Sequence, residues 1–354
     1  MTRIKETSGK VTIQDVAALA GVSIKTVSRV VNREPAVRED TRERVEAAIA
    51  ELDYRPNPSA RSLAAQRAFV VGLLYDNPSA SYIINIQEGA LRTCREARYD
   101  LLIHPCHHAD PGISREIELL LEHSKVDGIL LTPPVADVDA VIDMLNARQT
   151  PYVKIAPGDR ADIRRSVFTN DRQVCSEMTR YLASLGHQAI AFIRGHPDHK
   201  AIADRYAGYR DGLKDSGLQF DERLVQQGFN DFASGADCAA TLLRQEQPPT
   251  AIFAANDDMA TGVMRFAHQQ NIEIPGELSV VGFDDIPIAA QAYPALTTIR
   301  QPMRKMAEKA TELLLAQLRG HLPEPQIIVV DSSLQLREST GPARTTSLEL
   351  AAEN

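Results

Sequence analysis

The sequence predicts an α/β protein in which a small helical domain precedes a larger domain of alternating strands and helices. Residues 12–52 place their apolar side chains at helical spacing. After residue 67, short apolar runs alternate with helical stretches, which is typical of parallel sheets covered on both faces. With 354 residues, the chain is long enough for two or three domains with cores of their own.

Composition and charge are those of a globular protein, with 44% hydrophobic and 24% charged residues. The apolar runs are strand-sized, and the polar N-terminus predicts neither a signal peptide nor an anchor, so we expect a cytoplasmic protein with no membrane partner. Four widely spaced cysteines suit a reducing compartment. The net charge of −8 divides into +3 for residues 1–67 and −11 for the rest, which is a weak indication of nucleic-acid binding.

The first two helices predict a helix-turn-helix. Thr12 begins the first helix, and Asp15 closes a capping box with it. Gly21 ends this helix after about two turns, because glycine readily adopts the positive φ of a tight turn. Ser23 caps a second short helix that runs from Ile24 to about residue 32. Two short helices joined by such a turn form the DNA-binding motif.

The polar face of the second helix favours DNA binding over a plain helical bundle. No acidic residue occurs between Ile24 and Arg33, whereas a solvated face would normally carry both signs of charge. Lysine, arginine, serine and asparagine are the side chains that contact phosphates and base edges. On this face they are Lys25, Ser28, Arg29, Asn32 and Arg33.

A third helix over residues 39–52 and a linker over residues 56–67 follow. Asn57 is placed to cap a short helix, and Pro58 suits its first position, so Ser59–Ala65 can form about two turns. Such a helix is marginal alone and would form only against a partner, as a switch requires. A plain interdomain linker remains the alternative.

These segments resemble the headpiece and hinge of the lactose-repressor/purine-repressor (LacI/GalR-type) family of bacterial transcriptional regulators. The resemblance covers Val11–Asn32 almost without gaps, and it returns at Tyr54–Asn57 and at Ala60–Leu63. It implies that Leu63 wedges into the minor groove at the operator centre beside the partner's Leu63.

The resemblance also implies which side chains contact DNA. Ile24, Lys25 and Arg29 would occupy positions that contact bases in the major groove. Where the family usually has Ser or Thr at the start of the third helix, this chain has Arg38, which loses the cap and allows a phosphate contact. The expected DNA contacts are Thr12, Ser23, Ile24, Lys25, Thr26, Ser28, Arg29, Asn32, Arg38, Asn57, Ala60 and Leu63.

The body of the chain is predicted to form two doubly wound lobes, with a ligand between them near the strand ends. The resemblance extends here to a core like that of periplasmic sugar-binding proteins, in which the chain crosses between lobes near Val167, Thr298 and Val330. The expected domains are a headpiece (1–55), a hinge (56–67), a first lobe (68–166 and 299–329), a second lobe (167–298 and 330–338) and a disordered tail (339–354). Beyond Arg337 the sequence lacks leucine heptads, so we expect no tetramerising coiled coil.

Polar residues at the predicted strand ends suit a sugar, because carboxylate, amide and guanidinium groups can bind several hydroxyls. The resemblance implies Arg205, Asn256 and Asp284 as effector contacts; Gln301 and the pair Tyr82 and Ile83 match the family less closely. We also expect an aromatic contact from residues 228–232. Ala156 stands about where the lactose repressor has an acidic sugar ligand. Asp257 and Asp285 are expected to cap helices.

The cluster Cys106, His107, His108 and Asp110 contains metal-binding residue types, but no second ligand group follows at zinc spacing. We therefore expect a solvated loop, with no metal and no cofactor. Acid pairs after strands could hold Mg²⁺ in an enzyme. However, the nucleophile-elbow, Walker and dinucleotide-binding motifs do not follow any predicted strand.

The sequence thus predicts a transcriptional regulator, most simply a repressor, that binds a near-palindromic double-stranded DNA operator as a homodimer. A small molecule between the lobes, expected to be a sugar, would control operator affinity, as an inducer or as a corepressor. The alternative is a cytosolic sugar-binding protein or sugar-processing enzyme with the same core.

Overall fold

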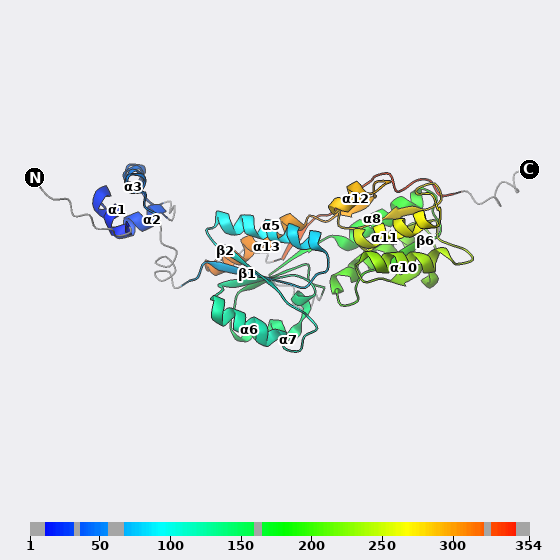
Figure 1. The fold of residues 1–354 in the computed structure, drawn as a ribbon, viewed down its shortest axis with the longest axis horizontal. Helices are drawn as coiled ribbons and strands as arrows, with labels where there is room; N and C mark the ends of the chain where they lie inside the picture. The colour runs from blue at the N-terminus through cyan, green and yellow to red at the C-terminus, as the bar shows by residue number, and fades with distance from the viewer. Residues whose placement is uncertain (1–10, 32–35, 56–66, 159–164, 322–326, 345–354) are drawn as a thin grey trace, which may run out of the picture. The chain divides into compact units, whose positions relative to one another are not determined.

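The computed structural model describes residues 11–31, 36–55, 67–158, 165–321 and 327–344 (Figure 1). The chain divides into two compact units, one ending at Ala68 and the other beginning at Phe69. Within the described ranges, no helix has both the length and the apolar character needed to cross a bilayer.

The described residues of the first unit form three helices, and these confirm the predicted helix-turn-helix. They are α1 (Ile13–Ala20), α2 (Ile24–Val31) and α3 (Glu39–Glu51). At the start of α1, the Asp15 carboxylate accepts hydrogen bonds from the backbone N–H and the hydroxyl of Thr12, at 2.8 and 2.7 Å. Asp15 therefore satisfies a backbone donor that the helix itself leaves unpaired.

The turn between α1 and α2 has the expected chemistry. Gly21 adopts a φ of 64°, and the Ser23 hydroxyl accepts a hydrogen bond from the Thr26 backbone N–H at 3.1 Å. By contrast, α3 begins after Arg38 without a side-chain cap, as expected. The apolar faces of the three helices meet in one small core, formed by Val16, Ala17, Ala20, Val27, Val30, Val45 and Ala48.

In the second unit, the first lobe has a parallel sheet of six strands in the order β11-β5-β4-β3-β1-β2. The strands are β1 (Val70–Tyr75), β2 (Asp100–Pro105), β3 (Gly128–Leu131), β4 (Tyr152–Ile155), β5 (Ser166–Thr169) and β11 (Ile327–Val330). Helices α5 (Ala80–Glu96) and α13 (Met303–Leu318) cover one face, and α6 (Ile113–Ser124) and α7 (Asp139–Ala147) cover the other (Figure 1).

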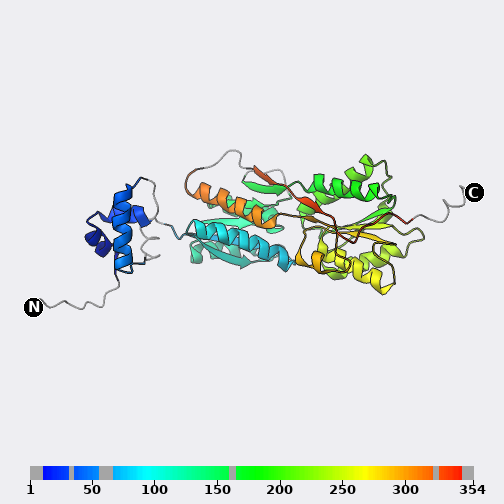
Figure 2. The ribbon, with the colours of Figure 1, turned by 90° about the horizontal axis from the view of Figure 1, so that it is seen from above.

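The second lobe repeats this arrangement around a parallel sheet of four strands in the order β7-β6-β8-β9. The strands are β6 (Ile190–Arg194), β7 (Val225–Gln227), β8 (Ala251–Ala254) and β9 (Ser279–Val281). Helices α8 (Asp171–Ser184) and α9 (Ala203–Asp215) pack on one face, and α10 (Phe232–Leu243) and α11 (Asp257–Gln269) on the other (Figure 2). The short helix α12 (Pro287–Gln291) follows β9.

The chain passes between the lobes three times, a few residues from the predicted positions. Strand β5 belongs to the first lobe up to Thr169, because it pairs there with β11, so the first crossing follows Thr169 rather than Val167. The antiparallel pair β10 (Thr298–Arg300) and β12 (Ser333–Gln335) accompanies the other two crossings. Residues up to Arg300 remain with the second lobe, since Asp284 forms a bridge with Arg300.

The expectation of a disordered tail from residue 339 is wrong for residues 339–344. Ser339 is fully buried, and its hydroxyl donates to the carbonyl of Val280 at 2.6 Å. Ala343 donates its backbone N–H to the Leu185 carbonyl at 2.8 Å. The segment is ordered because it satisfies backbone groups of the second lobe, which its polar sequence does not signal. Residues 345–354 lie outside the described part of the chain.

Close contact between α10 and α11 depends on glycine, and it leads to a stability prediction. A Cβ atom at Gly262 would overlap the backbone carbonyl oxygen of Phe232. Gly262→Ala should therefore lower the free energy of unfolding by about 1–3 kcal/mol, despite the better helix propensity of alanine. Urea unfolding measures this loss. Gly276→Ala is the control, since its Cβ would meet only the flexible Glu273 side chain; equal stability losses would contradict the packing argument.

Candidate functional sites

The helix-turn-helix presents an exposed polar face on α2. The side chains of Ser23, Ile24, Lys25 and Arg29 are exposed, and Thr26 and Ser28 are half-buried. Ile24 is 47% exposed although it is large and apolar. An exposed apolar side chain on the same short helix as two exposed cations suits contact with a thymine methyl group and with base edges.

The other predicted DNA contacts divide by location. Thr12 and Arg38 are exposed at the starts of α1 and α3. Four positions lie outside the described residues, so their predicted roles stay predictions: Asn32, Asn57, Ala60 and Leu63.

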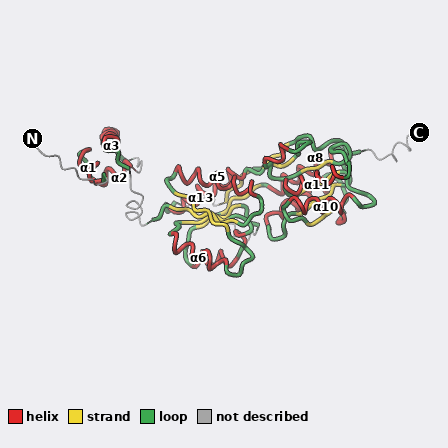
Figure 3. The backbone as a smooth tube through the Cα atoms, viewed as in Figure 1, coloured by secondary structure: helices red, strands yellow, loops and turns green. Residues whose placement is uncertain are grey.

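In the second unit, the two lobes enclose a polar cavity of about 50 Å³. Residues of both lobes supply its walls; the helices, strands and loops of the two lobes are traced in Figure 3. The first lobe contributes Asn77, Ser79, Tyr82, Pro133 and Ala156. The second lobe contributes His199, Ile202, Arg205, Asn230, Asn256 and Asp284. Gln301 lies on the segment between the lobes. Five of the six predicted effector contacts therefore come together.

Ile83 is the sixth predicted contact, and it does not line the cavity. It packs in the core of the first lobe and is 5% exposed. Its neighbour Tyr82 lines the cavity instead, because adjacent residues on α5 point in different directions around the helix.

Arg205 is held rigidly at the centre of the second-lobe wall. Its Nε donates to the Asp171 carboxylate at 3.1 Å, and its Nη1 donates to the Ala255 carbonyl at 2.6 Å. The guanidinium also lies over the ring of Phe283, 3.6 Å from the ring centroid. Its Nη2 is 3.7 Å from Asp284 Oδ1. The buried arginine is thereby shared between two carboxylates, which largely offset its charge.

Asp284 is the most perturbed carboxyl group of the cavity wall. Burial raises its pKa to about 7, although the nearby Arg205 guanidinium favours the charged form. Its backbone φ is 111°, a conformation that L-residues rarely adopt. A buried and backbone-strained carboxylate that titrates near neutrality is typical of a functional site.

Two buried polar atoms of the cavity wall, Tyr82 Oη and Gln301 Oε1, have no hydrogen-bond partner among the described residues. Burial also raises the pKa of the Tyr82 phenol, which keeps it a neutral donor. Leaving such atoms unpaired costs free energy, so the pair indicates a ligand with both an acceptor and a donor.

The structure corrects the predicted helix caps. Asn256, rather than Asp257, caps α11, because its Oδ1 accepts from the Met259 backbone N–H at 2.9 Å. Asp257 is fully buried, and it accepts from the Thr298 hydroxyl and the Ile286 N–H at 2.5 and 2.9 Å. Burial raises the pKa of Asp257 well above its usual range.

Asp285 does not cap a helix either. Its carboxylate pairs with the guanidinium groups of Arg300 and Arg337, at 2.6 and 2.5 Å. Both predictions were wrong because each carboxylate bonds residues of segments that are distant in sequence, instead of the first backbone N–H groups of the helix that follows the strand.

Sequence reasoning also missed Asn77, Ser79, His199 and Asn230. In the segment expected to supply an aromatic, Asn230 lines the cavity, with a φ of 63° that asparagine tolerates. Burial, together with His196 and other nearby cations, lowers the pKa of His199 to about 4, so its neutral ring can both donate and accept. The signal for Asn230 was its residue type, since asparagine favours left-handed turns.

The histidine segment is a loop with His107 and Asp110 exposed, as expected, and its two imidazoles also contact Asp76. The side chains of Asp76, His107 and His108 each offer one potential metal-ligand atom, and these atoms lie within 4.8 Å of one another. The Asp76 carboxylate already accepts hydrogen bonds from both imidazoles, at 3.2 and 2.6 Å, and we assign no metal to this group. Cys106 instead donates to the carbonyl of Tyr75 at 3.6 Å.

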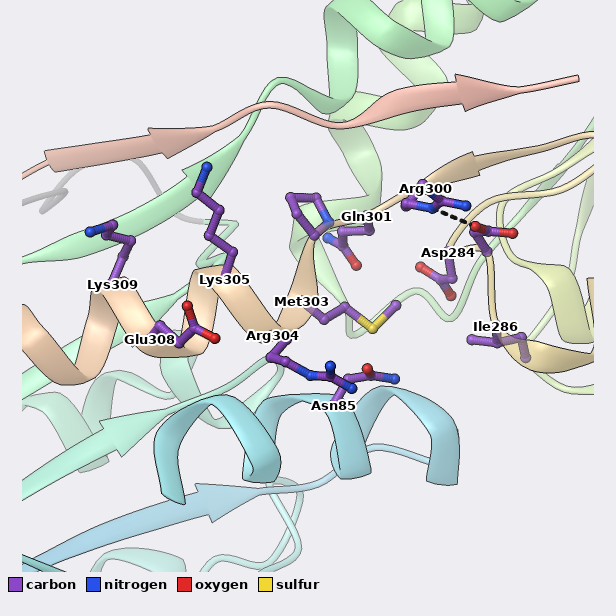
Figure 4. A pocket seen from close by; sticks show the side chains of 12 residues that line it. Asn85, Asp284, Ile286, Arg300, Gln301, Met303, Arg304, Lys305, Glu308 and Lys309 are labelled. Atoms are coloured by element: carbon purple, nitrogen blue, oxygen red, sulfur yellow. Dashed lines mark hydrogen bonds and ion pairs between the residues drawn. The ribbon is translucent and has the colours of Figure 1, made fainter. Parts of the chain in front are cut away.

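A larger and more open hollow of about 540 Å³ adjoins the cavity, and Asp284 and Gln301 line both (Figure 4). Its cations are mostly paired: Arg300 bonds Asp285 at 2.6 Å, and Arg304 pairs with Glu88. The enclosed cavity differs from this hollow in being lined also by Tyr82, whose buried hydroxyl has no hydrogen-bond partner among the described residues.

A helix-turn-helix joined to a two-lobed domain with a buried polar cavity defines a class of proteins, namely transcriptional regulators controlled by small molecules. Residues 12–57 match the family model for bacterial regulatory proteins of the lacI family, and residues 179–340 match that for a periplasmic binding protein-like domain. The HTH-type transcriptional regulator GalR of Escherichia coli (strain K12) is 34% identical, over 96% of this chain and 97% of that protein. The chain belongs to the lacI family and is an HTH-type transcriptional regulator.

Solved structures agree with this assignment. The complex of the transcriptional regulator CelR with cellobiose is 30% identical, with a TM-score of 0.72 over 93% of this chain and 99% of that one. The lac repressor dimer bound to operator and the anti-inducer ONPF is 28% identical, with a TM-score of 0.75 over 94% of this chain and 100% of that one.

Proposed function

We propose that this regulator is a cytoplasmic repressor that binds a near-palindromic operator as a homodimer and that a neutral sugar between the lobes controls its operator affinity. The observation that carries the proposal is the cavity, where Arg205, Asn256 and Asp284 lie beside two unpartnered buried atoms, Tyr82 Oη and Gln301 Oε1.

The charge of the cavity favours a neutral ligand. Arg205 is shared between the carboxylates of Asp171 and Asp284, so its positive charge is already compensated and does not require an anionic ligand. The neighbouring groups are amides, hydroxyls and a neutral imidazole, which pair well with sugar hydroxyls. Pro133, Ala156 and Ile202 add apolar walls. The CelR structure, which holds cellobiose, supports the same ligand class.

The size of the cavity links ligand binding to lobe movement. Its volume of about 50 Å³ is far below the roughly 300 Å³ at the lower end of small-molecule sites. A sugar can therefore enter only if the lobes separate. A change in lobe angle would bias the hinge segment 56–67, where the proposed wedge Leu63 lies, and so couple the two sites.

The direct test is operator binding titrated with a panel of mono- and disaccharides, with purine bases as the competing ligand class. We expect at least one sugar to change operator affinity and to raise the melting temperature. Sugar binding without operator binding would favour a sugar-binding protein, and conversion of the sugar would favour an enzyme. A response to purines alone would reject a sugar effector.

Arg29→Ala should weaken operator binding by about 1–3 kcal/mol and relax base preference at one position per half-site. The reason is the exposed position of Arg29 on α2, where its guanidinium can bond a guanine edge. Titrations with operator and with single-base variants measure both effects. Arg44→Ala removes an equal charge from the exposed side of α3 and should leave base preference unchanged. Unaltered sequence preference in Arg29→Ala would remove Arg29 from the set of base contacts.

Effector binding should depend on pH through Asp284, whose pKa is raised to about 7. Ionised Asp284 accepts hydroxyl hydrogen bonds strongly, whereas the protonated form does so weakly. The dissociation constant of the responding sugar should therefore be nearly constant above pH 8 and rise by about tenfold per pH unit well below 7. Calorimetric titrations between pH 5.5 and 8.5 measure this dependence. In Asp284→Asn the contribution of this carboxyl group to the pH profile should disappear, so an unchanged profile would assign the dependence to another group.

A further inference from the structure

A cluster of titratable side chains joins the two lobes beside the cavity. Asp76 follows β1 and His108 follows β2, so both belong to the first lobe, whereas Asp198 follows β6 of the second. The His108 ring bonds both carboxylates: its Nδ1 lies 2.6 Å from Asp76 Oδ2, and its Nε2 lies 3.1 Å from Asp198 Oδ2. The next residues along the chain, Asn77 and His199, line the cavity.

The two contacts require a doubly protonated ring. A neutral imidazole has one N–H, so it can donate to one carboxylate, and its other nitrogen then turns a lone pair toward the second. Partial burial disfavours the charged ring, but the hydrogen bonds to Asp76 and Asp198 outweigh it and raise the pKa of His108. The backbone N–H of His108 also donates to Asp76 at 2.9 Å, which anchors the loop in the first lobe.

Other titratable groups face this contact from both lobes. His107 Nδ1 is 3.2 Å from Asp76 Oδ2, but its side chain is 71% exposed. His196 Nδ1 lies 3.8 Å from the Asp198 carboxylate, beyond hydrogen-bond reach. His199 is neutral because burial, together with surrounding cations, lowers its pKa to about 4. His108 is therefore the one group of this set that bonds carboxylates of both lobes.

We propose that His108 is a positioning residue for the effector response, whose ring latches the closed cleft by binding Asp76 and Asp198 together. When the ring loses its second proton, the bond to Asp198 is lost and the lobes separate more readily. Closure of the cleft thus takes up a proton, so that low pH favours the closed form and high pH the open form. The proposal rests on the proposed effector cleft, but its test needs no effector, so the two can fail separately.

Lobe separation can be measured by double electron–electron resonance between spin labels on α7 and α10, introduced as Asp143→Cys and Asp237→Cys at exposed positions. The native cysteines should resist labelling at neutral pH. Burial raises the thiol pKa of Cys94 and Cys106 to about 12 each and that of Cys238 to about 11, and it also raises that of Cys175.

All samples are full-length chain without DNA or sugar. They carry Asp284→Asn, because Asp284 pairs with Arg205 and is a second titrating group of the cleft. The substitution prevents Asp284 from adding its own pH dependence to lobe separation. A chelator removes stray divalent cations. Labelled chain is compared from pH 6 to pH 9 with chain that also carries His108→Gln or Asp198→Asn. His123→Ala is the matched control, because His123 is an exposed histidine of the first lobe that bonds only the Leu119 carbonyl of its own helix.

We expect the ratio of closed to open populations to fall as pH rises, by up to about tenfold for each unit by which closure raises the pKa of His108. The same fall is expected in His123→Ala. In His108→Gln and Asp198→Asn the ratio should not depend on pH. Asp198 is 54% exposed on its side chain, so its replacement should not disturb folding. A pH-independent ratio in the parent, or an undiminished pH dependence in Asp198→Asn, would overturn the proposal.

Discussion

Replacement of Asp284 by asparagine is expected to weaken the response of operator binding to effector strongly, while operator affinity without effector stays unchanged. Asparagine keeps the size of the side chain and tolerates the φ of 111° better than most residues, so the backbone should not move. It removes a charge-assisted acceptor worth about 1.5–3 kcal/mol, which corresponds to roughly 10- to 150-fold in effector affinity.

The measurement is operator affinity as a function of sugar concentration for the parent and Asp284→Asn, together with calorimetric titration of the sugar alone. Asp285→Asn is a stringent neighbouring control, because Asp285 bonds Arg300 and Arg337 instead of lining the enclosed cavity. A half-maximal sugar concentration in Asp284→Asn equal to that of the parent would exclude Asp284 as an effector contact.

Arg205→Ala is expected to lower the free energy of unfolding of the second unit by about 3–5 kcal/mol and to eliminate sugar binding. The change leaves the buried carboxylates of Asp171 and Asp284 without their shared cation, and the Ala255 carbonyl loses its 2.6 Å hydrogen bond. It also removes the stacking on Phe283. Urea unfolding at pH 8 measures the loss.

Protonation of the buried carboxylates should partly offset the loss of stability in Arg205→Ala, because an uncompensated carboxylate becomes neutral in acid. The difference between Arg205→Ala and parent should therefore be smaller at pH 5.5 than at pH 8. Arg172→Ala is the control, since it removes an exposed pair with Asp211 and should change stability by less than about 1 kcal/mol. If Arg205→Ala behaves like Arg172→Ala, the buried charge network does not stabilise the fold.

The headpiece and the alternation of strands and helices could be predicted because their determinants are local. The Thr12–Asp15 capping box, the left-handed Gly21 and the Ser23 cap act within four residues, and the apolar spacing of α1, α2 and α3 sets one buried face for each helix. Short apolar runs between helical stretches likewise predicted the alternation of strands and helices in both lobes.

The cavity could be predicted only in part. The family resemblance indicated Arg205, Asn256 and Asp284, and all three line the cavity. Ile83 was wrong, because pairing it with Tyr82 ignored the direction in which the helix turns each side chain.

Local sequence pattern was sufficient for the helix-turn-helix and for the doubly wound core, since capping and amphipathic periodicity depend on near neighbours. Tertiary packing was needed to bring His199 and Asn230 to the cavity, to order residues 339–344 and to place Asp198 against His108. These contacts join residues that are far apart in sequence, and the hydrogen bonds and pKa shifts they create depend on burial, which arises only when distant segments pack together.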